Sequence, residues 1–413
     1  MIHLKKSFKL RLITLLPILS CSFLGYTQST YSEFEREKSI ERKIEIALEL
    51  RSYFIRNDID SLLVLSSYMD SSKRLSRSET ASAVRQSCIG SYHVRTGAFW
   101  VGMNQLKKSR QYFLRTKNFR ELSRIDNEIG NGYLVNGIYY QGAKYFASSL
   151  DYGQKSTEET AHFNGMIGLG KIFCAVGDTI QGIRLISIFL SNCLGLNKFE
   201  SAADASSYLG MLYEAVGDME MMEVYYRRGI VYAEESNSKS LQSSCFNNEA
   251  ILKFISGDLD SSIILFRNAL ALRLEFGQKK SIIESYFNIG GFYLETGVLD
   301  SSEVNFIKSL KISEQAGFLP DQYDALSSLK EIYLIEGKRE AEISALDVEM
   351  KRIAGIIANH SEIDSDIYKV ASEFEESIRS RFESKPKSLW TIGNLGTLCL
   401  VVLISLLYRK NRS

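Results

Sequence analysis

Apolar and polar positions between about residues 43 and 345 repeat with a period of 40 residues. A glycine stands at the same place in successive periods, and an asparagine stands there one period earlier: Asn57, Gly97, Gly137, Gly177, Gly217, Gly257, Gly297 and Gly337. Glycine and asparagine are the residues that most readily take the left-handed conformation at a helix end. The register therefore predicts that each one marks the turn between two antiparallel helices.

Apolar positions are fixed relative to that turn residue. Four residues before it comes an aromatic side chain in most repeats, with His93 and Lys253 as exceptions, and nine residues after it comes a large one: Leu106, Phe146, Ile186, Tyr226, Phe266 and Phe306. Eight and seven residues before it come a large and a small residue, the small ones being Gly90, Gly130, Gly170, Gly210 and Gly290. Each helix thus has one apolar face, and the small residues predict a close approach of two helices.

The order Leu-Gly, Tyr, Gly and a second-helix aromatic, as in the segment LGMLYEAVGDMEMMEVYYRRG that starts at Leu209, resembles the tetratricopeptide repeat family. The resemblance covers residues about 43 to 345, and the longer period is similar to the variant of bacterial signalling regulators and kinesin light chains. It implies an all-α, right-handed superhelical solenoid of about eight helical hairpins over residues 31–345. One hairpin cannot bury its apolar face alone, so stacking of neighbours must close the core.

Both ends of the chain are apolar. Basic residues up to Arg11, an apolar run over 12–24 and small or polar residues after it predict a signal peptide at 1–27, with an uncleaved anchor or a lipid on Cys21 as alternatives. Ser388 to Tyr408 carries no charge and is long enough to span a membrane once, followed by a short tail at 409–413. We expect a single-pass membrane protein with the repeats exported, on the periplasmic side of a bacterial inner membrane, and the tail in the cytoplasm.

Residues 346–385 are predicted to form a helical stalk or capping helices. Ile343, Leu346, Met350, Ile353 and Ile357 have coiled-coil spacing, and a second apolar stripe follows at Ile367, Val370, Phe374 and Ile378. Two interpretations are open. The stripe docks back onto the end of the solenoid, or it pairs with a second copy to give a homodimer through stalk and span.

Composition narrows the function. The 50 Lys plus Arg balance 49 Asp plus Glu, which argues against nucleic acid as a partner. The three prolines include only Pro320 between the apolar ends, as expected for an all-helical interior. Cys88, Cys174, Cys193 and Cys245 are widely spaced and are interpreted as small core residues. The four histidines are scattered, and we found no metal or phosphate motif, so the sequence predicts no enzyme activity and no cofactor.

A candidate peptide-binding groove follows from helical phase. The first helix of each hairpin should line the concave face with residues thirteen, ten, six and two before the turn residue. Those positions hold Arg51, Arg95, Arg124, Asn127, Asn131, Asn164 and Lys171 in the amino half, and Asp204, Ser207, Asn247, Glu284, Glu295, Asp324 and Glu331 in the carboxyl half. This change of sign suits an extended peptide with oppositely charged ends, and Phe287 and Ile251 would add exposed apolar surface. The alternative is that the charges are simply solvated.

Two functions remain open. The chain is a membrane-anchored module that binds a protein or peptide in the groove. Alternatively, because it resembles the exported sensor half of tetratricopeptide-containing histidine kinases and regulators of Bacteroidetes, it is a sensor that acts through a kinase or regulator encoded separately.

Overall fold

The computed structural model describes residues 30, 32–156, 165–234, 238–337, 340–360 and 365–383. The predicted signal peptide at 1–27, the predicted span at Ser388 to Tyr408 and the tail at 409–413 lie outside these residues. Among the residues that are described, no helix combines the length and apolar character needed to cross a membrane.

The described part of the chain is helical and contains no strand. Successive helices pack as antiparallel hairpins, and each hairpin packs on the next. Their bounds are α3 Ile40–Asn57 with α4 Ser61–Ser71, α5 Glu79–Arg95 with α6 Phe99–Arg115, α7 Phe119–Val135 with α8 Tyr139–Lys155, α9 Met166–Ala175 with α10 Thr179–Gly195, α11 Phe199–Ala215 with α12 Met219–Glu234, α13 Lys239–Ile255 with α14 Leu259–Phe276, α15 Lys279–Glu295 with α16 Leu299–Ala316, and α17 Leu319–Glu336 with α18 Glu340–Ala358. A short 3₁₀ turn, Leu75–Arg77, precedes α5, and α19 Ser365–Glu383 follows the hairpins. The predicted all-α solenoid of stacked hairpins is confirmed.

The turn glycines adopt the predicted conformation. All seven, from Gly97 to Gly337, have positive φ angles between 65° and 95°. Asn57 does not: α3 continues through it, and its amide donates to the carbonyl of Tyr53 and so caps the helix from within. The prediction of a left-handed helix end was therefore wrong at that position. The turns between hairpins were not predicted, although Lys117, Asn197, Gly277 and Gly317 also have positive φ angles there.

The small residue of each first helix faces the large residue of the second helix. A Cβ atom added to Gly210 would lie 2.5 Å from the ring of Tyr226, and one on Gly90 would lie 2.7 Å from the Cγ of Leu106. Gly130, Gly170 and Gly290 have the same relation to Phe146, Ile186 and Phe306. The two helices of these hairpins therefore approach closely, as the repeat pattern predicts, and the same glycine-to-large-residue contact recurs in the core of successive hairpins.

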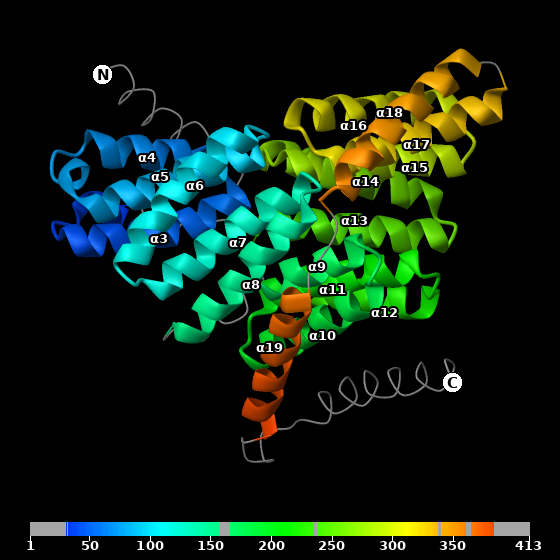
Figure 1. Cartoon of the computed structure of the whole chain (residues 1–413). Coiled ribbons are helices and arrows are strands. Elements are labelled where there is room, and N and C mark those ends of the chain that lie inside the picture. Colours follow the sequence, from blue (N-terminus) through cyan, green and yellow to red (C-terminus); the bar gives the residue numbers. More distant parts are fainter. Residues whose placement is uncertain are drawn as a thin grey trace.

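The superhelix folds back on itself (Figure 1). We call α3–α8 the amino arm and α13–α18 the carboxyl arm, and α9–α12 join them. The turn at Gly97 lies against the end of α16, where an added Cβ would come within 2.5 Å of the Cα of Ala316. The turn at Gly137 lies against Pro320 and Ile357, at 3.2–3.3 Å on the same measure. Turns of the amino arm therefore pack between the turns that separate hairpins in the carboxyl arm.

Helix α19 returns to the middle of the solenoid and packs on α8 and α10 (Figure 1). Ile367 and Ala371 are buried in the core of the middle hairpins, and the ring of Tyr368 lies 4.7 Å from that of Phe173. Arg184 forms a 2.6 Å ion pair with Glu375, whose side chain is almost fully buried. The described part of the predicted apolar stripe, at Ile367, therefore packs on the middle hairpins and not at the solenoid end. Dimerisation through the stalk stays a prediction.

Candidate ligand-binding face

The first helices of the hairpins carry the residues of the predicted groove, and we call this set of residues the inner face. The described members are Arg51 on α3, Arg95 on α5, Arg124, Asn127 and Asn131 on α7, Lys171 on α9, Asp204 and Ser207 on α11, Asn247 on α13, Glu284 and Glu295 on α15, and Asp324 and Glu331 on α17. Asn164 lies outside the described residues. The side chains differ greatly in what they contact.

The cations of the amino arm are already engaged by carboxylates and hydroxyls. Arg51 is only 2% exposed and donates to the hydroxyl of Ser91 at 3.2 Å, so it belongs to the interior and its assignment to a groove was wrong. Arg95 pairs with Glu128 at 2.9 Å. Burial alone would raise the pKa of Glu128, but Arg95 and Arg51 lower it on balance, so the carboxylate stays charged.

Arg124 is paired as well. Its guanidinium contacts Glu121 at 3.1 Å, and that carboxylate is 1% exposed. The acidic residues of α7 that neutralise these arginines escaped the sequence analysis, since they lie beside the four positions chosen for the groove. The amino arm therefore offers much less free positive charge than its sequence suggests.

One acidic residue of the predicted groove is neutralised across the superhelix. Arg56, at the end of α3, lies 3.1 Å from Glu200 and 3.4 Å from Asp204, both on α11. The attraction of the two carboxylates outweighs burial and raises the pKa of Arg56. Nearby, Gln278 donates to the carbonyl of Ile55 at 2.6 Å. Asp204 is thus part of the contact between distant hairpins.

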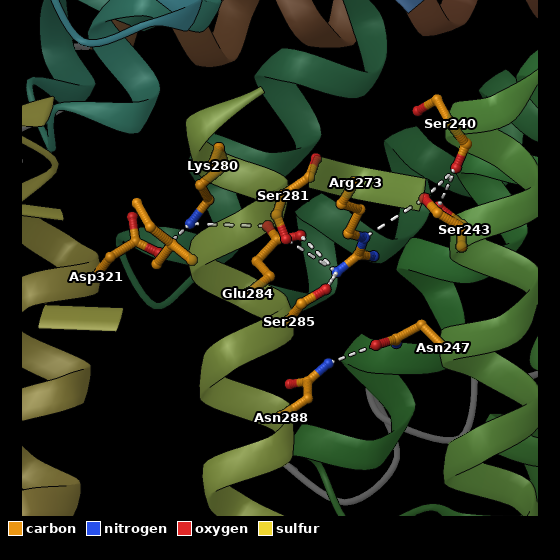
Figure 2. A network of polar contacts seen from close by, with 12 residues as sticks. Ser240, Ser243, Asn247, Arg273, Lys280, Ser281, Glu284, Ser285, Asn288 and Asp321 are labelled. Carbon is orange, nitrogen blue, oxygen red and sulfur yellow. Dashed lines mark hydrogen bonds and ion pairs between the residues drawn. The ribbon is translucent and has the colours of Figure 1, made fainter. Parts of the chain in front are cut away.

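Amide and hydroxyl side chains link neighbouring first helices. Asn248 donates to Ser207 at 2.7 Å, and Asn288 donates to Asn247 at 2.6 Å (Figure 2). Each bond joins a residue ten before a turn glycine to a residue nine before the next, 41 positions along the chain. The same relation would join Asn127 to position 168, which is a glycine, and the buried Oδ1 of Asn127 has no hydrogen-bond partner among the described residues.

A charged cluster occupies the start of α15 (Figure 2). Lys280 lies 2.5 Å from Asp321 and 3.8 Å from Glu284. Burial would lower the pKa of Lys280, but the two carboxylates raise it on balance. Lys280 is seventeen residues before Gly297, so extending the predicted stripe by one helical turn would have found it. Glu284 is consequently partly neutralised.

Arg273 supports this cluster from α14 (Figure 2). Its guanidinium donates to the hydroxyl of Ser285 at 3.0 Å and to the carbonyl of Ser281 at 3.1 Å. The side chain is 7% exposed and lies 4.0 Å from the carboxylate of Glu284. Burial lowers the pKa of Arg273, and the attraction of Glu284 offsets only part of this effect. Arg273 fixes α15 relative to α13 and α14. It lies on a second helix, where the sequence analysis did not look.

Lys171 differs from the other cations. Its ammonium lies over the ring of Tyr208, 4.5 Å from the centroid, and it makes no ion pair or hydrogen bond with the residues described. Burial lowers its pKa, although Asp204 and Glu284 act in the opposite direction. A partly desolvated ammonium over an aromatic ring is suited to receive an anionic group from a ligand.

The remaining predicted residues are less informative. Glu295 and Glu331 are exposed. Phe287 and Ile251 are not exposed apolar surface as predicted, because both are partly buried and pack on core clusters.

Burial raises the pKa of Cys88 to about 11 and of Cys193 to about 12, as for thiols that pack in a core. In the described residues no group of three acidic, histidine or cysteine side chains could hold a metal ion.

Comparison with known proteins identifies the architecture. No family model matches the chain, and no curated protein matches it. A solved structure of a Rap protein complexed with Competence and Sporulation Factor is similar, with a TM-score of 0.58, 15% identity, and coverage of 81% of this chain and 92% of that one. The structure of the Rap conjugation gene regulator of the plasmid pLS20 in complex with the Phr* peptide is also similar. Its TM-score is 0.55 and its sequence identity 13%, and the match covers 79% of this chain and 94% of that one. These likenesses show a tetratricopeptide-like helical-repeat fold.

Proposed function

We propose that this protein is a non-enzymatic binding module that holds a peptide, or an extended segment of a protein, on its inner face. The observation that carries the proposal concerns two polar groups of the inner face, the Lys171 ammonium and the buried Asn127 amide oxygen, which have no hydrogen-bond or ion-pair partner among the described residues. Most charges around them are neutralised internally. Buried polar groups normally have partners, so groups without them are suited to meet a ligand.

The similar structures support a peptide as ligand. One of the Rap proteins named above was solved in complex with Competence and Sporulation Factor and the other with the Phr* peptide. Amide side chains along the inner face can bond the backbone of an extended chain, and the ring of Tyr208 offers apolar contact beside Lys171.

Selection of peptides from a random library by the immobilised full chain tests this proposal. Lys171→Glu should remove most of the enrichment, whereas Lys311→Glu, an exposed lysine on α16, should leave it unchanged. Circular dichroism confirms that both variants fold. Enrichment that is equal for both variants, or absent from the unchanged chain, would contradict the proposal.

We further propose that the repeats are exported and that the apolar segment 388–408 tethers them to the membrane. The charge pattern of the two ends supports this placement. Labelling intact cells through Lys311→Cys with a membrane-impermeant maleimide tests it. Labelling before cell lysis is expected, and labelling only after lysis would refute it.

A sensor role, acting through a separate kinase or regulator, is the second candidate. One contact favours it: α19, which leads toward residues 388–408, packs through Tyr368 on Phe173 of α9, two residues from Lys171. A ligand held by α9 could in this way act on α19. Hydrogen exchange of residues 365–383 with and without a selected peptide tests the coupling, and identical protection would remove this candidate.

A further inference from the structure

Lys171 and Asp324 are two charges of the inner face that have no ion pair or hydrogen bond within the described part of the fold. Most of the others are consumed by ion pairs: Arg95 with Glu128, Arg124 with Glu121, Arg56 with Asp204, and Lys280 with Asp321 and Glu284. Of the charges that remain, Lys171 is the cation, and Asp324 is the carboxylate that lies one helical turn from the paired Asp321. Glu295 and Glu331 are exposed and remain as well. Lys171 and Asp324 lie on α9 and α17, far apart in sequence and opposite in sign.

Asp324 is the one of two neighbouring carboxylates that has no ion pair with a described residue. Asp321 lies one turn earlier on α17 and takes the ion pair with Lys280 at 2.5 Å. Asp324 is left with no ion pair or hydrogen bond to a described residue, and its side chain reaches solvent. Burial by the surrounding face and repulsion from Asp321 raise its pKa to about 6, against the attraction of Lys280. A cationic group brought close would restore the charged form.

The same neighbours surround both charges. Lys280 acts electrostatically on Lys171 and on Asp324, so neither is remote from it. The phenol of Tyr139, at the start of α8, is influenced by Lys280, Asp324 and Asp321. Tyr208, which supports Lys171, is influenced in turn by Tyr139 and Glu284. The ring of Tyr208 thus supports the cation, and the ion pair of Lys280 with Asp321 lies one helical turn from the anion.

We propose that the ligand is a dipolar peptide, whose free carboxylate binds Lys171 over the ring of Tyr208 and whose basic side chain binds Asp324. This assignment rests on the proposed peptide-binding function and narrows it to one ligand class. An anionic peptide would satisfy Lys171 but meet Asp324, Asp321 and Glu284, and a cationic one would meet Lys171 and Lys280. Only a ligand with both signs completes both unpaired groups without creating a new one.

Four pools of short random peptides test the assignment against the full chain. Two have a free carboxyl terminus and two an amidated one, and within each pair one pool contains a single arginine. The unchanged protein should retain the free-carboxyl, arginine-containing pool about tenfold or more above each of the others, as charge-assisted contacts imply. Equal retention of all four pools would overturn the dipolar assignment.

Two variants separate the halves of the site. Lys171→Met should abolish the preference for a free carboxylate and keep the preference for arginine. Asp324→Asn should do the reverse. Lys311→Met and Glu314→Gln, which change exposed charges on α16, serve as controls and should alter neither preference. Loss of both preferences in a single variant, with normal circular dichroism, would mean that the two groups do not bind separate ends of one ligand.

The pH dependence gives an independent readout. The preference for arginine should rise as the pH increases through about 6, because Asp324 then loses its proton, and it should be flat in Asp324→Asn. Asp321, Lys280, Tyr139 and Glu284 face the same region and stay constant between the two proteins. Failure of the broader function has a different signature: the unchanged protein would retain no pool at all, whereas retention without charge preference would refute only the dipolar ligand.

Discussion

Turn glycines in the two halves of the solenoid look alike in sequence and in backbone but have different surroundings. Gly97 has a φ of 95° and Gly217 one of 79°, and each joins the two helices of a hairpin. A Cβ on Gly97 would collide with the backbone of Ala316, whereas one on Gly217 would meet nothing within 4 Å. Gly177, Gly257, Gly297 and Gly337 are as open as Gly217.

The repeat pattern therefore determines the backbone conformation of each turn within a hairpin. The path of the superhelix determines which distant residues contact that turn. Gly97 and Ala316 are separated by more than five repeat periods, so no local pattern relates them. The turns at Gly97 and Gly137 pack on the carboxyl arm, whereas the turns within the later hairpins, from Gly177 to Gly337, have no such neighbour in the described residues. The two arms contact one another, and Arg95, next to their junction, is paired with Glu128.

Replacement of the two glycines by alanine sharpens the comparison most. Gly217→Ala should lower the free energy of unfolding by about 1 kcal/mol, because alanine is strained at positive φ. Gly97→Ala should lower it by about 3 kcal/mol, since overpacking against Ala316 adds to the same strain. Urea denaturation of the full chain measures both. Equal losses would mean that the arms do not touch at this turn.

Helical glycines give a local counterpart to that test. Gly210→Ala places a Cβ 2.5 Å from the ring of Tyr226 and should cost about 1–2 kcal/mol after the gain in helix propensity. Gly291→Ala meets nothing within 4 Å and should stabilise by about 0.5–1 kcal/mol. Urea denaturation reads out both signs. A stabilising Gly210→Ala would refute the close helix approach within the hairpin.

The ion pair across the superhelix should have a smaller effect. Arg56→Gln removes the contacts with Glu200 and Asp204 and should cost about 1 kcal/mol at low salt, because the pair is partly exposed. Arg227→Gln breaks an exposed pair within one helix and should cost only about 0.3 kcal/mol. Thermal unfolding in low and high salt measures the two. An Arg56 effect that does not shrink in high salt would not be the ion pair described here.

The pH dependence from Asp324 is expected to be the smallest effect, because the side chain is exposed and solvent screens its interactions. Its pKa is about 6 in the folded chain against an ordinary value of 3.8, so the folded state binds the proton more tightly. Stability should therefore fall as the pH rises from about 4 through 6, and Asp324→Asn should remove that part of the slope. Asp300→Asn, at an exposed site on α16, is the control. A slope unchanged by Asp324→Asn would contradict the raised pKa.

Much of the fold could be predicted from the period. The glycine register located the hairpin turns, and the small and large positions located the contact between the two helices of a hairpin. Turns between hairpins escaped, because Lys117 and Asn197 take the same left-handed conformation as Gly277 and Gly317 without sharing their residue type. A pattern finds such turns only where glycine is used.

The candidate site was predicted in part. Helical phase correctly placed Lys171 and Asn127 on the first helices, but it could not show that Arg51 is buried against Ser91 or that Asp204 belongs to Arg56. Those pairings depend on burial and on contacts between distant hairpins. The charged residues counted along the sequence therefore overestimated the unpaired charge that the inner face offers to a ligand.

The contact between the arms is the central claim, and chemical crosslinking tests it most directly. Arg95 and Gln278 approach to 3.4 Å between the guanidinium and the amide oxygen, so Arg95→Cys with Gln278→Cys should crosslink within one chain through a short bismaleimide. Arg115→Cys with Val298→Cys has the same sequence separation, but each site lies one helix length of about 25 Å from the junction and should not react. Selective crosslinking of the first pair is the predicted result. Crosslinking of neither pair in the folded, monomeric chain would show that the superhelix is open.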